Sequence, residues 1–100
     1  MRAATQPNRE QITLSEVMHA LSDPARIEIL LELEGGEQPC SHCCVDVPKS
    51  SLSHHFKVLR QAGVITTRIE GTKHINSIRR VDLNARFPGL IATVLKAARR

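Results

Sequence analysis

The sequence contains no tryptophan and no tyrosine, and only two phenylalanines, Phe56 and Phe87, among its 100 residues. Proteins that bind single-stranded nucleic acid stack bases on aromatic side chains, so the composition does not favour that class. No apolar run approaches the roughly 18 residues of a membrane-spanning helix, and the polar N-terminus lacks the apolar core of a signal peptide. The sequence therefore predicts a cytoplasmic protein without a membrane partner.

Cysteine is scarce, and the motifs of common enzymes are missing. The three cysteines lie within five positions and cannot build a disulfide framework, and a reducing compartment would keep them as thiols. There is no nucleophile elbow, glycine-rich phosphate loop or zinc-hydrolase motif, and the helical pattern lacks the βαβ context of a thioredoxin-like site. We therefore do not expect an enzyme.

Basic residues are scarce in the first half of the chain, and acidic residues are scarce in the second. Residues 1–47 hold three arginines against eight acidic residues, whereas residues 48–100 hold eleven lysines and arginines against only Glu70 and Asp82. A basic surface attracts a phosphate backbone, although a charge bias alone also fits a solvated basic face. DNA binding becomes the favoured interpretation only because the basic half also contains a suitable helix and hairpin.

The predicted helix runs over residues 50–63. Leu52, Phe56 and Leu59 recur at i, i+4 and i+7, which gives one apolar stripe for the core. Hydrogen-bond donors are left on the other sides, and small hydroxyl side chains stand at the N-terminal end, where a helix can accept a phosphate. This is the pattern of a DNA recognition helix.

Two runs rich in β-branched residues follow, at 64–69 and 74–79, and they flank four residues that include Gly71. They predict a hairpin, or wing, with Arg68, Lys73 and His74 near its tip.

The rest of the chain reads mostly as helix within one domain. Residues 1–11 are polar without periodicity and predict a flexible tail, whereas residues 12–100 form the domain. Ser15 is expected to cap a helix whose Leu14, Val17, Met18 and Leu21 face inward. Asp23 and Pro24 then open a second helix that ends at Gly35-Gly36. A last helix over 87–98 follows a turn at Asp82 and Leu83.

The order of these elements, with the stretches LSDPARIEIL (21–30) and SHHFKVLRQAGVI (53–65), resembles the ArsR/SmtB family of bacterial winged-helix transcriptional repressors. The resemblance covers residues 12–98. It implies a mainly α fold with a small β-hairpin, and a homodimer that binds an inverted-repeat operator in double-stranded DNA and is released by an inducer, often a metal ion. The first and last helices of this family join the two protomers. The corresponding dimer residues here are Leu14, Val17, Leu90, Ile91, Val94 and Leu95.

Residues carried over to the DNA interface come from the helix and the wing. The bases that they contact cannot be identified from the sequence. No Asn or Gln precedes Gln61 on the helix, and Lys57 and Arg60 are the only Lys or Arg candidates for a bidentate contact with a base. His54 and His55 are adjacent and point about 100° apart, so His55 either faces DNA or packs at the helix crossing. The full predicted set is Ser50, Ser51, Ser53, His54, His55, Lys57, Arg60, Arg68, Lys73 and His74.

Cys40, His42, Cys43 and Cys44 bring three thiols and an imidazole together, a donor set that suits soft or borderline ions. The family's Cys-x-Cys spacing is absent, and residues 88–100 contain no Asp, Glu, His or Cys for the site on the last helix. Three alternatives remain: cysteines that pack as small apolar residues, a sensor of a metal or metalloid ion, and a thiol redox switch. We expect no required cofactor, and a soft or borderline metal ion at the Cys40–Cys44 cluster is the one candidate.

A winged helix that binds an acidic protein partner is the alternative function, and salt-sensitive, sequence-preferring binding to a duplex would distinguish the two.

Overall fold

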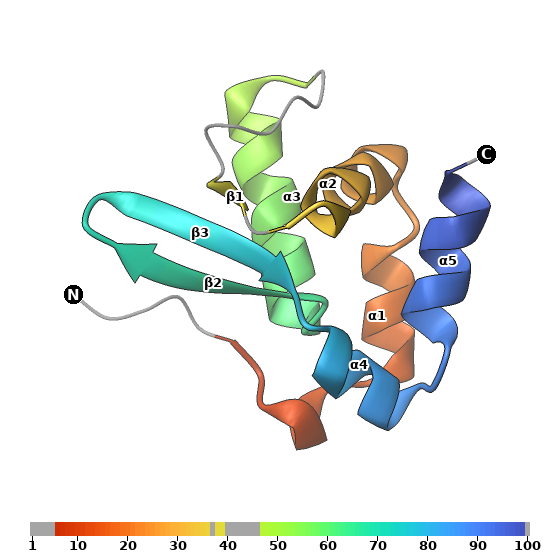
Figure 1. Cartoon of the computed structure of the whole chain (residues 1–100). Coiled ribbons are helices and arrows are strands. Elements are labelled where there is room, and N and C mark those ends of the chain that lie inside the picture. The colour runs from red at the N-terminus through yellow and green to blue at the C-terminus, as the bar shows by residue number, and fades with distance from the viewer. Residues whose placement is uncertain (1–5, 37, 40–46, 100) are drawn as a thin grey trace.

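The computed structural model describes residues 6–36, 38–39 and 47–99. The helices pack together beside the base of a small antiparallel sheet, whose hairpin projects away from them (Figure 1). The elements in chain order are η1 (Arg9–Gln11), α1 (Leu14–Ala20), α2 (Pro24–Glu34), β1 (Gln38–Pro39), α3 (Lys49–Ala62), β2 (Ile65–Glu70), β3 (Lys73–Ile78), α4 (Arg80–Arg86) and α5 (Leu90–Ala98).

Helix α2 begins as its sequence predicts. The carboxylate of Asp23 accepts hydrogen bonds from the backbone N–H groups of Ala25 and Arg26, and Pro24 occupies the first turn. Burial raises the pKa of Asp23, but these two backbone hydrogen bonds, together with the electrostatic effect of His55 and Arg26, hold the pKa below the ordinary value. The cap of α1, by contrast, is Thr13 and not Ser15.

The sheet has three strands in the order β1-β3-β2. Strands β2 and β3 form the predicted hairpin, in which Ile65 pairs with Ile78 and Glu70 with Lys73. The turn is therefore the two residues Gly71 and Thr72, shorter than expected, and Gly71 has φ 62°. Strand β1, which the sequence did not predict, pairs with β3 on its other side.

The core lies between α1, α2, α3, α5 and the base of the hairpin. Phe56 and Leu59 of α3 are buried and Leu52 is partly buried, which confirms the predicted stripe of that helix. None of the described helices is long and apolar enough to cross a membrane. The fully or nearly buried apolar residues are Ile12, Val17, Ala20, Ile29, Leu30, Leu33, Phe56, Leu59, Ala62, Val64, Ile65, Leu83, Ile91 and Leu95.

Three of the predicted dimer residues are core residues. Val17, Ile91 and Leu95 are each 1% exposed within one protomer, so their side chains have no surface to offer a partner. The inward face predicted for α1 is also wrong in part, because Leu14 and Met18 are 51% and 50% exposed. The apolar stripe of this short helix is broader than the part that the core covers. Sequence periodicity alone does not show which residues of the stripe are buried and which are exposed.

The tail predicted for residues 1–11 is wrong for its described part, residues 6–11. Asn8 caps η1 and forms a capping box with Gln11, and Gln6 and Arg9 reach the sheet and α4. The segment lacks apolar periodicity because hydrogen bonds, and not buried apolar residues, hold it. Helix α4 was likewise expected only as a turn.

Candidate nucleic-acid interface

Helix α3 presents one apolar face to the core and one polar row to solvent. It begins after Pro48 without a side-chain cap and ends at Gly63, whose φ of 86° suits glycine. Residues spaced by three or four positions share a face of a helix, and the exposed ones here form a continuous row. That row consists of Ser50, Ser53, His54, Lys57 and Gln61.

Gln61 belongs to this row although the sequence did not predict it. The signal was the four-residue spacing from Lys57, which places both side chains on the same face. Lys49, the first residue of α3, is also exposed, and it adds a cation to the end where the helix offers free N–H groups.

Three predicted residues of α3 lie outside this row. Ser51 is half-buried, and so is Arg60, whose Nε is buried without a hydrogen-bond partner in the described part of the chain. His55 is half-buried at the crossing of α2 and α3. The structure thus favours packing over DNA contact for His55, the second of the two alternatives that its position allowed.

Arg26 explains the position of His55. Its Nη1 lies 3.1 Å from His55 Nδ1, while its Nε and Nη2 donate to the carbonyls of Ala20 (2.7 Å) and His19 (3.3 Å). Because arginine has only donors, this contact is a hydrogen bond in the tautomer of His55 whose Nδ1 accepts and whose ring proton lies on Nε2. Arg26, only 6% exposed, therefore joins the end of α1 to the recognition helix.

The wing carries its predicted residues on two faces. Side chains alternate along a strand, so Arg68, Glu70 and Lys73 face one side, while His74 faces the other with its pairing neighbour Ile69. All five are exposed. Arg68 Nε is 2.9 Å from Glu70 Oε2, so a phosphate would have to compete with this carboxylate for Arg68.

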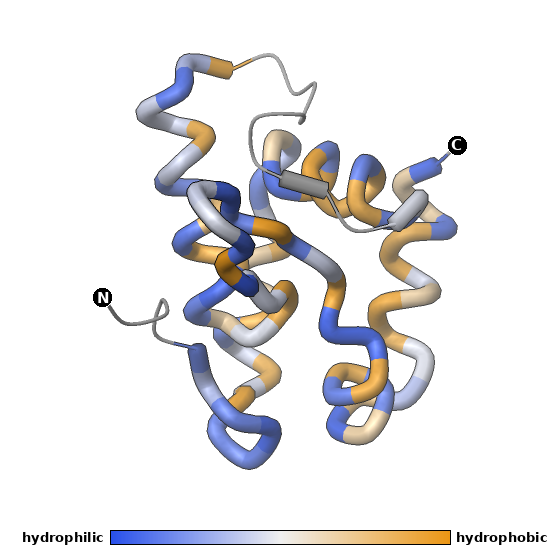
Figure 2. The backbone as a smooth tube through the Cα atoms, turned by 60° about the vertical axis from the view of Figure 1, so that its left-hand side comes forward, coloured by the Kyte–Doolittle hydropathy of each residue, from blue (hydrophilic) through white to orange (hydrophobic). Residues whose placement is uncertain are grey.

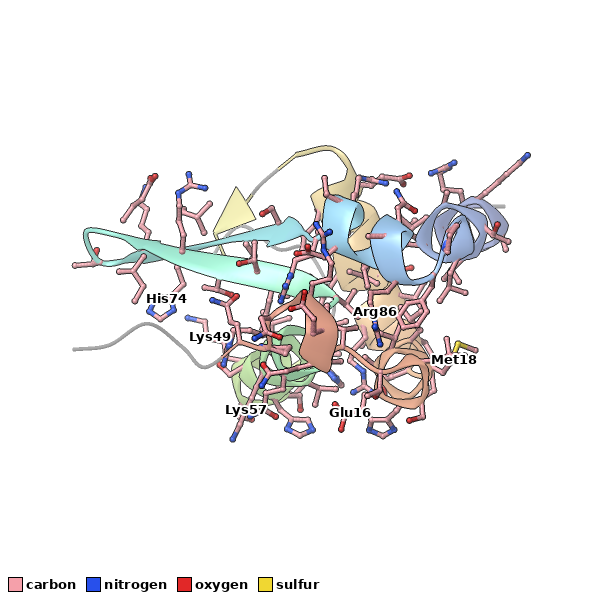
Figure 3. All side chains as sticks on the ribbon, turned by 90° about the horizontal axis from the view of Figure 1, so that it is seen from below. Glu16, Met18, Lys49, Lys57, His74 and Arg86 are labelled. Atoms are coloured by element: carbon pink, nitrogen blue, oxygen red, sulfur yellow. The ribbon has the colours of Figure 1, made fainter. Side chains whose placement is uncertain are left out.

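The polar row of α3 and the wing lie toward the same end of the molecule. Figure 3 shows Lys49, Lys57 and the wing residue His74 at one end, with Met18 of α1 at the other. Residues 47–78 contain five lysines and arginines against the single acid Glu70. This end therefore has a positive potential that suits a polyanion.

The predicted thiol cluster, Cys40, His42, Cys43 and Cys44, lies outside the described residues. Among the residues that are described, no group of three His, Cys, Asp or Glu side chains could hold a metal ion. Helix α5 has no ligand residue at all, so a metal site of the family's last-helix kind does not fit this chain.

A helix-turn-helix domain family matches residues 21–68, from the end of α1 into β2. The chain is 32% identical over 85 residues to an uncharacterised HTH-type transcriptional regulator of Bacillus subtilis, YceK, with 80% of this chain and 84% of that one covered. It is 40% identical over 68 residues to an arsenical resistance operon repressor of Staphylococcus xylosus, and this match covers 62% of each protein, less than two thirds of the repressor's length.

The fold is also that of solved regulators. A homodimeric winged helix-turn-helix DNA-binding domain from Mycobacterium bovis, described as a possible ArsR-family transcriptional regulator, superposes with a TM-score of 0.68. Its sequence is 26% identical, and the match covers 93% of this chain and 90% of that domain.

A basic helix exposed beside a projecting hairpin defines a winged helix-turn-helix domain, a class that binds DNA to regulate transcription. Within this class, the chain belongs to the ArsR/SmtB family of transcriptional regulators. The fold and family expected from the sequence are confirmed.

Proposed function

We propose that the protein is a homodimeric repressor that places the polar row of each α3 in the major groove of an inverted-repeat operator. The observation that carries the proposal is the row itself, in which Ser50, Ser53, His54 and Lys57 stand exposed beside the wing at the basic end of the molecule. Two-fold symmetry of the protein matches two-fold symmetry of the operator. The function is regulation and not catalysis, and it is carried out in the cytoplasm, where operator DNA lies.

Support for the dimer comes from two sources. The Mycobacterium bovis relative is described as homodimeric, and α1 of this chain leaves Leu14 and Met18 half-exposed, with Met18 at the end opposite the wing (Figure 3). Leu90 and Val94 of α5 are partly exposed at the same end, where Figure 2 shows hydrophobic colour along most of that helix. A second protomer would cover this apolar surface.

Binding to a duplex from the region upstream of the protein's own gene tests the operator proposal. Ser53→Ala and His54→Ala should each weaken binding to that duplex by about 1–3 kcal/mol, with little change on an unrelated duplex. Lys73→Ala on the wing should weaken both duplexes alike and lower the salt slope by about one. If the protein binds no duplex at low salt, the alternative function, a winged helix that binds an acidic protein partner, is favoured instead.

We further propose that Cys40, Cys43 and Cys44, with His42, release the repressor when they bind a soft or borderline ion or are oxidised. The donor set supports this, as does the arsenical resistance role of the Staphylococcus xylosus relative. The cluster precedes α3 by only a few residues in the sequence. A coupling free energy of about 1–3 kcal/mol between ion binding at the cluster and DNA binding by α3 would be enough to release the repressor.

The variant with all three cysteines changed to serine tests the release mechanism. It should dimerise and bind DNA but no longer respond to arsenite, Zn²⁺, Cu⁺ or a thiol oxidant, while counts of free thiols in the wild type separate ion binding from oxidation. Release of this variant by the same agent as the wild type would mean that the cysteines only pack.

A further inference from the structure

The segment from Gln6 to Ile12, here called the arm, crosses the base of the wing. Figure 1 shows it running beneath β2 before it turns into α1. Gln6 Oε1 accepts the backbone N–H of Thr67 at 2.7 Å, and Gln6 Nε2 donates to the Thr67 carbonyl at 3.3 Å. Strand β2 is an edge of the sheet, so one glutamine side chain here replaces the hydrogen bonds of a missing neighbouring strand.

The arm also bonds to residues that follow the C-terminal end of β3, at the base of the wing. The Pro7 carbonyl accepts from Arg79 Nη1 at 2.6 Å, and Arg9 Nε lies 2.8 Å from Asp82 Oδ1. The other carboxylate oxygen of Asp82 accepts from Nε and Nη2 of Arg79. Arg79 directly follows the wing, so this network holds the chain just where the hairpin ends.

A third contact reaches the recognition helix. A Cβ placed on Gly63, the residue that ends α3, would lie 2.5 Å from Ile12 Cγ1 and 3.4 Å from Pro7 Cγ. The arm therefore packs directly on the backbone that joins α3 to β2. Inside the wing, Thr67 Oγ1 donates to Asn76 Oδ1 at 2.7 Å, and both residues are buried, so a shift of Thr67 would carry β3 with it.

We propose that the arm is a strap that sets the angle between the wing and α3, and that Gln6 is a positioning residue for the wing's contact with DNA. The proposal rests on the proposed DNA binding. The arm touches the end of α3, the outer edge of β2 and the chain after β3, which are the places that decide where the wing points. Through Thr13, the cap of α1, it also connects the wing to the helix that carries the exposed Leu14 and Met18.

Gln6→Met tests the strap, because it keeps the length of the side chain and removes both hydrogen bonds. Gln11→Met is the matched control, since Gln11 Oε1 accepts from the backbone N–H of Asn8 within the arm. Hydrogen exchange of the Thr67 amide should be at least about tenfold faster in Gln6→Met and unchanged in Gln11→Met, with similar unfolding temperatures.

DNA binding then tests the positioning role. With the duplex from upstream of the gene, Gln6→Met should bind about three- to tenfold more weakly than wild type, and its salt slope should fall by about one. The ratio of affinities for this duplex and an unrelated one should not change, because α3 still reads the bases.

Each other outcome overturns a defined part of the proposal. Unchanged exchange at Thr67 would mean that Gln6 does not hold the strand. Faster exchange with wild-type affinity and salt slope would mean that the strap does not position the wing for DNA, and equal effects of both variants would remove the role from Gln6. Failure of the wild type to bind any duplex would instead overturn the proposed function, and with it the strap's role on DNA.

Discussion

Arg26 shows how much one buried cation can organise. It donates hydrogen bonds to the carbonyls of His19 and Ala20 at the end of α1, and its Nη1 contacts His55 Nδ1. Arg26→Met should lower the free energy of unfolding by about 2–3 kcal/mol, because the α1 carbonyls are left without their donors. Chemical denaturation measures this. The exposed Arg80→Met serves as control and should cost less than about 0.5 kcal/mol; equal losses in the two variants would contradict the role given to Arg26.

Gly63 and Gly71 separate backbone strain from packing. Both have positive φ, 86° and 62°, but a Cβ at Gly63 meets Ile12, whereas a Cβ at Gly71 meets nothing within 4 Å. Gly71→Ala should therefore destabilise by about 1 kcal/mol through its backbone alone. Gly63→Ala should cost about 1–3 kcal/mol more, because the arm must also move. Thermal unfolding of both variants measures the difference, and equal losses would mean that Ile12 does not press on this turn.

At the scale of elements, acid should loosen the strap. The hydrogen bonds from Arg9 and Arg79 lower the pKa of Asp82 below its ordinary 3.8, so the folded state binds this proton less tightly than the unfolded state does. The stabilisation is present above about pH 4 and is lost as pH falls through the folded-state pKa. Asp82→Asn should thus lower the free energy of unfolding by about 1 kcal/mol at pH 7. At a pH below the folded-state pKa of Asp82 it should change this free energy by almost nothing. Urea unfolding at the two pH values decides, and an equal cost at both would exclude the carboxylate as the cause.

Elements with a strong local signal could be predicted, and those held by distant contacts could not. The Asp23-Pro24 start of α2, the stripe of α3 and the hairpin are all local patterns in the sequence. Strand β1 has only two residues and exists because β3 is there to pair with. The arm escapes prediction for the same reason, since the Gln6 side chain and the Pro7 carbonyl accept hydrogen bonds from residues more than 60 positions away.

The candidate site follows the same division. Exposure of Ser53, His54 and Lys57 follows from the helical period once the apolar stripe is known. The assignment of His55 does not, because its partner Arg26 lies 29 positions earlier in the chain. The split of the wing residues between two faces depends on the register of the hairpin, which the sequence specifies only weakly here because residues 68–74 are exposed on both faces.

At the scale of the whole molecule, the basic end with Lys49, Lys57 and the wing lies opposite the end with the exposed Met18, as Figure 3 shows. This separation lets two protomers meet at one end while both recognition helices remain free. The burial of each residue decides whether it can test the dimer. Leu95 is 1% exposed, so Leu95→Glu would bury a carboxylate in the core of each protomer and unfold it, which says nothing of association.

Met18→Glu is the sharper test. Met18 is 50% exposed on α1, so a folded monomer tolerates glutamate there, but a dimer would bury the unpaired charge in its interface. We expect the dimer dissociation constant to rise at least about 100-fold, with loss of operator binding and a nearly unchanged unfolding temperature of the protomer. Val81→Glu on α4 is the matched control, because Val81 is 74% exposed and lies outside the proposed interface. Sedimentation of both variants decides: a dimeric Met18→Glu, or a monomeric Val81→Glu, would place the interface elsewhere on the protein.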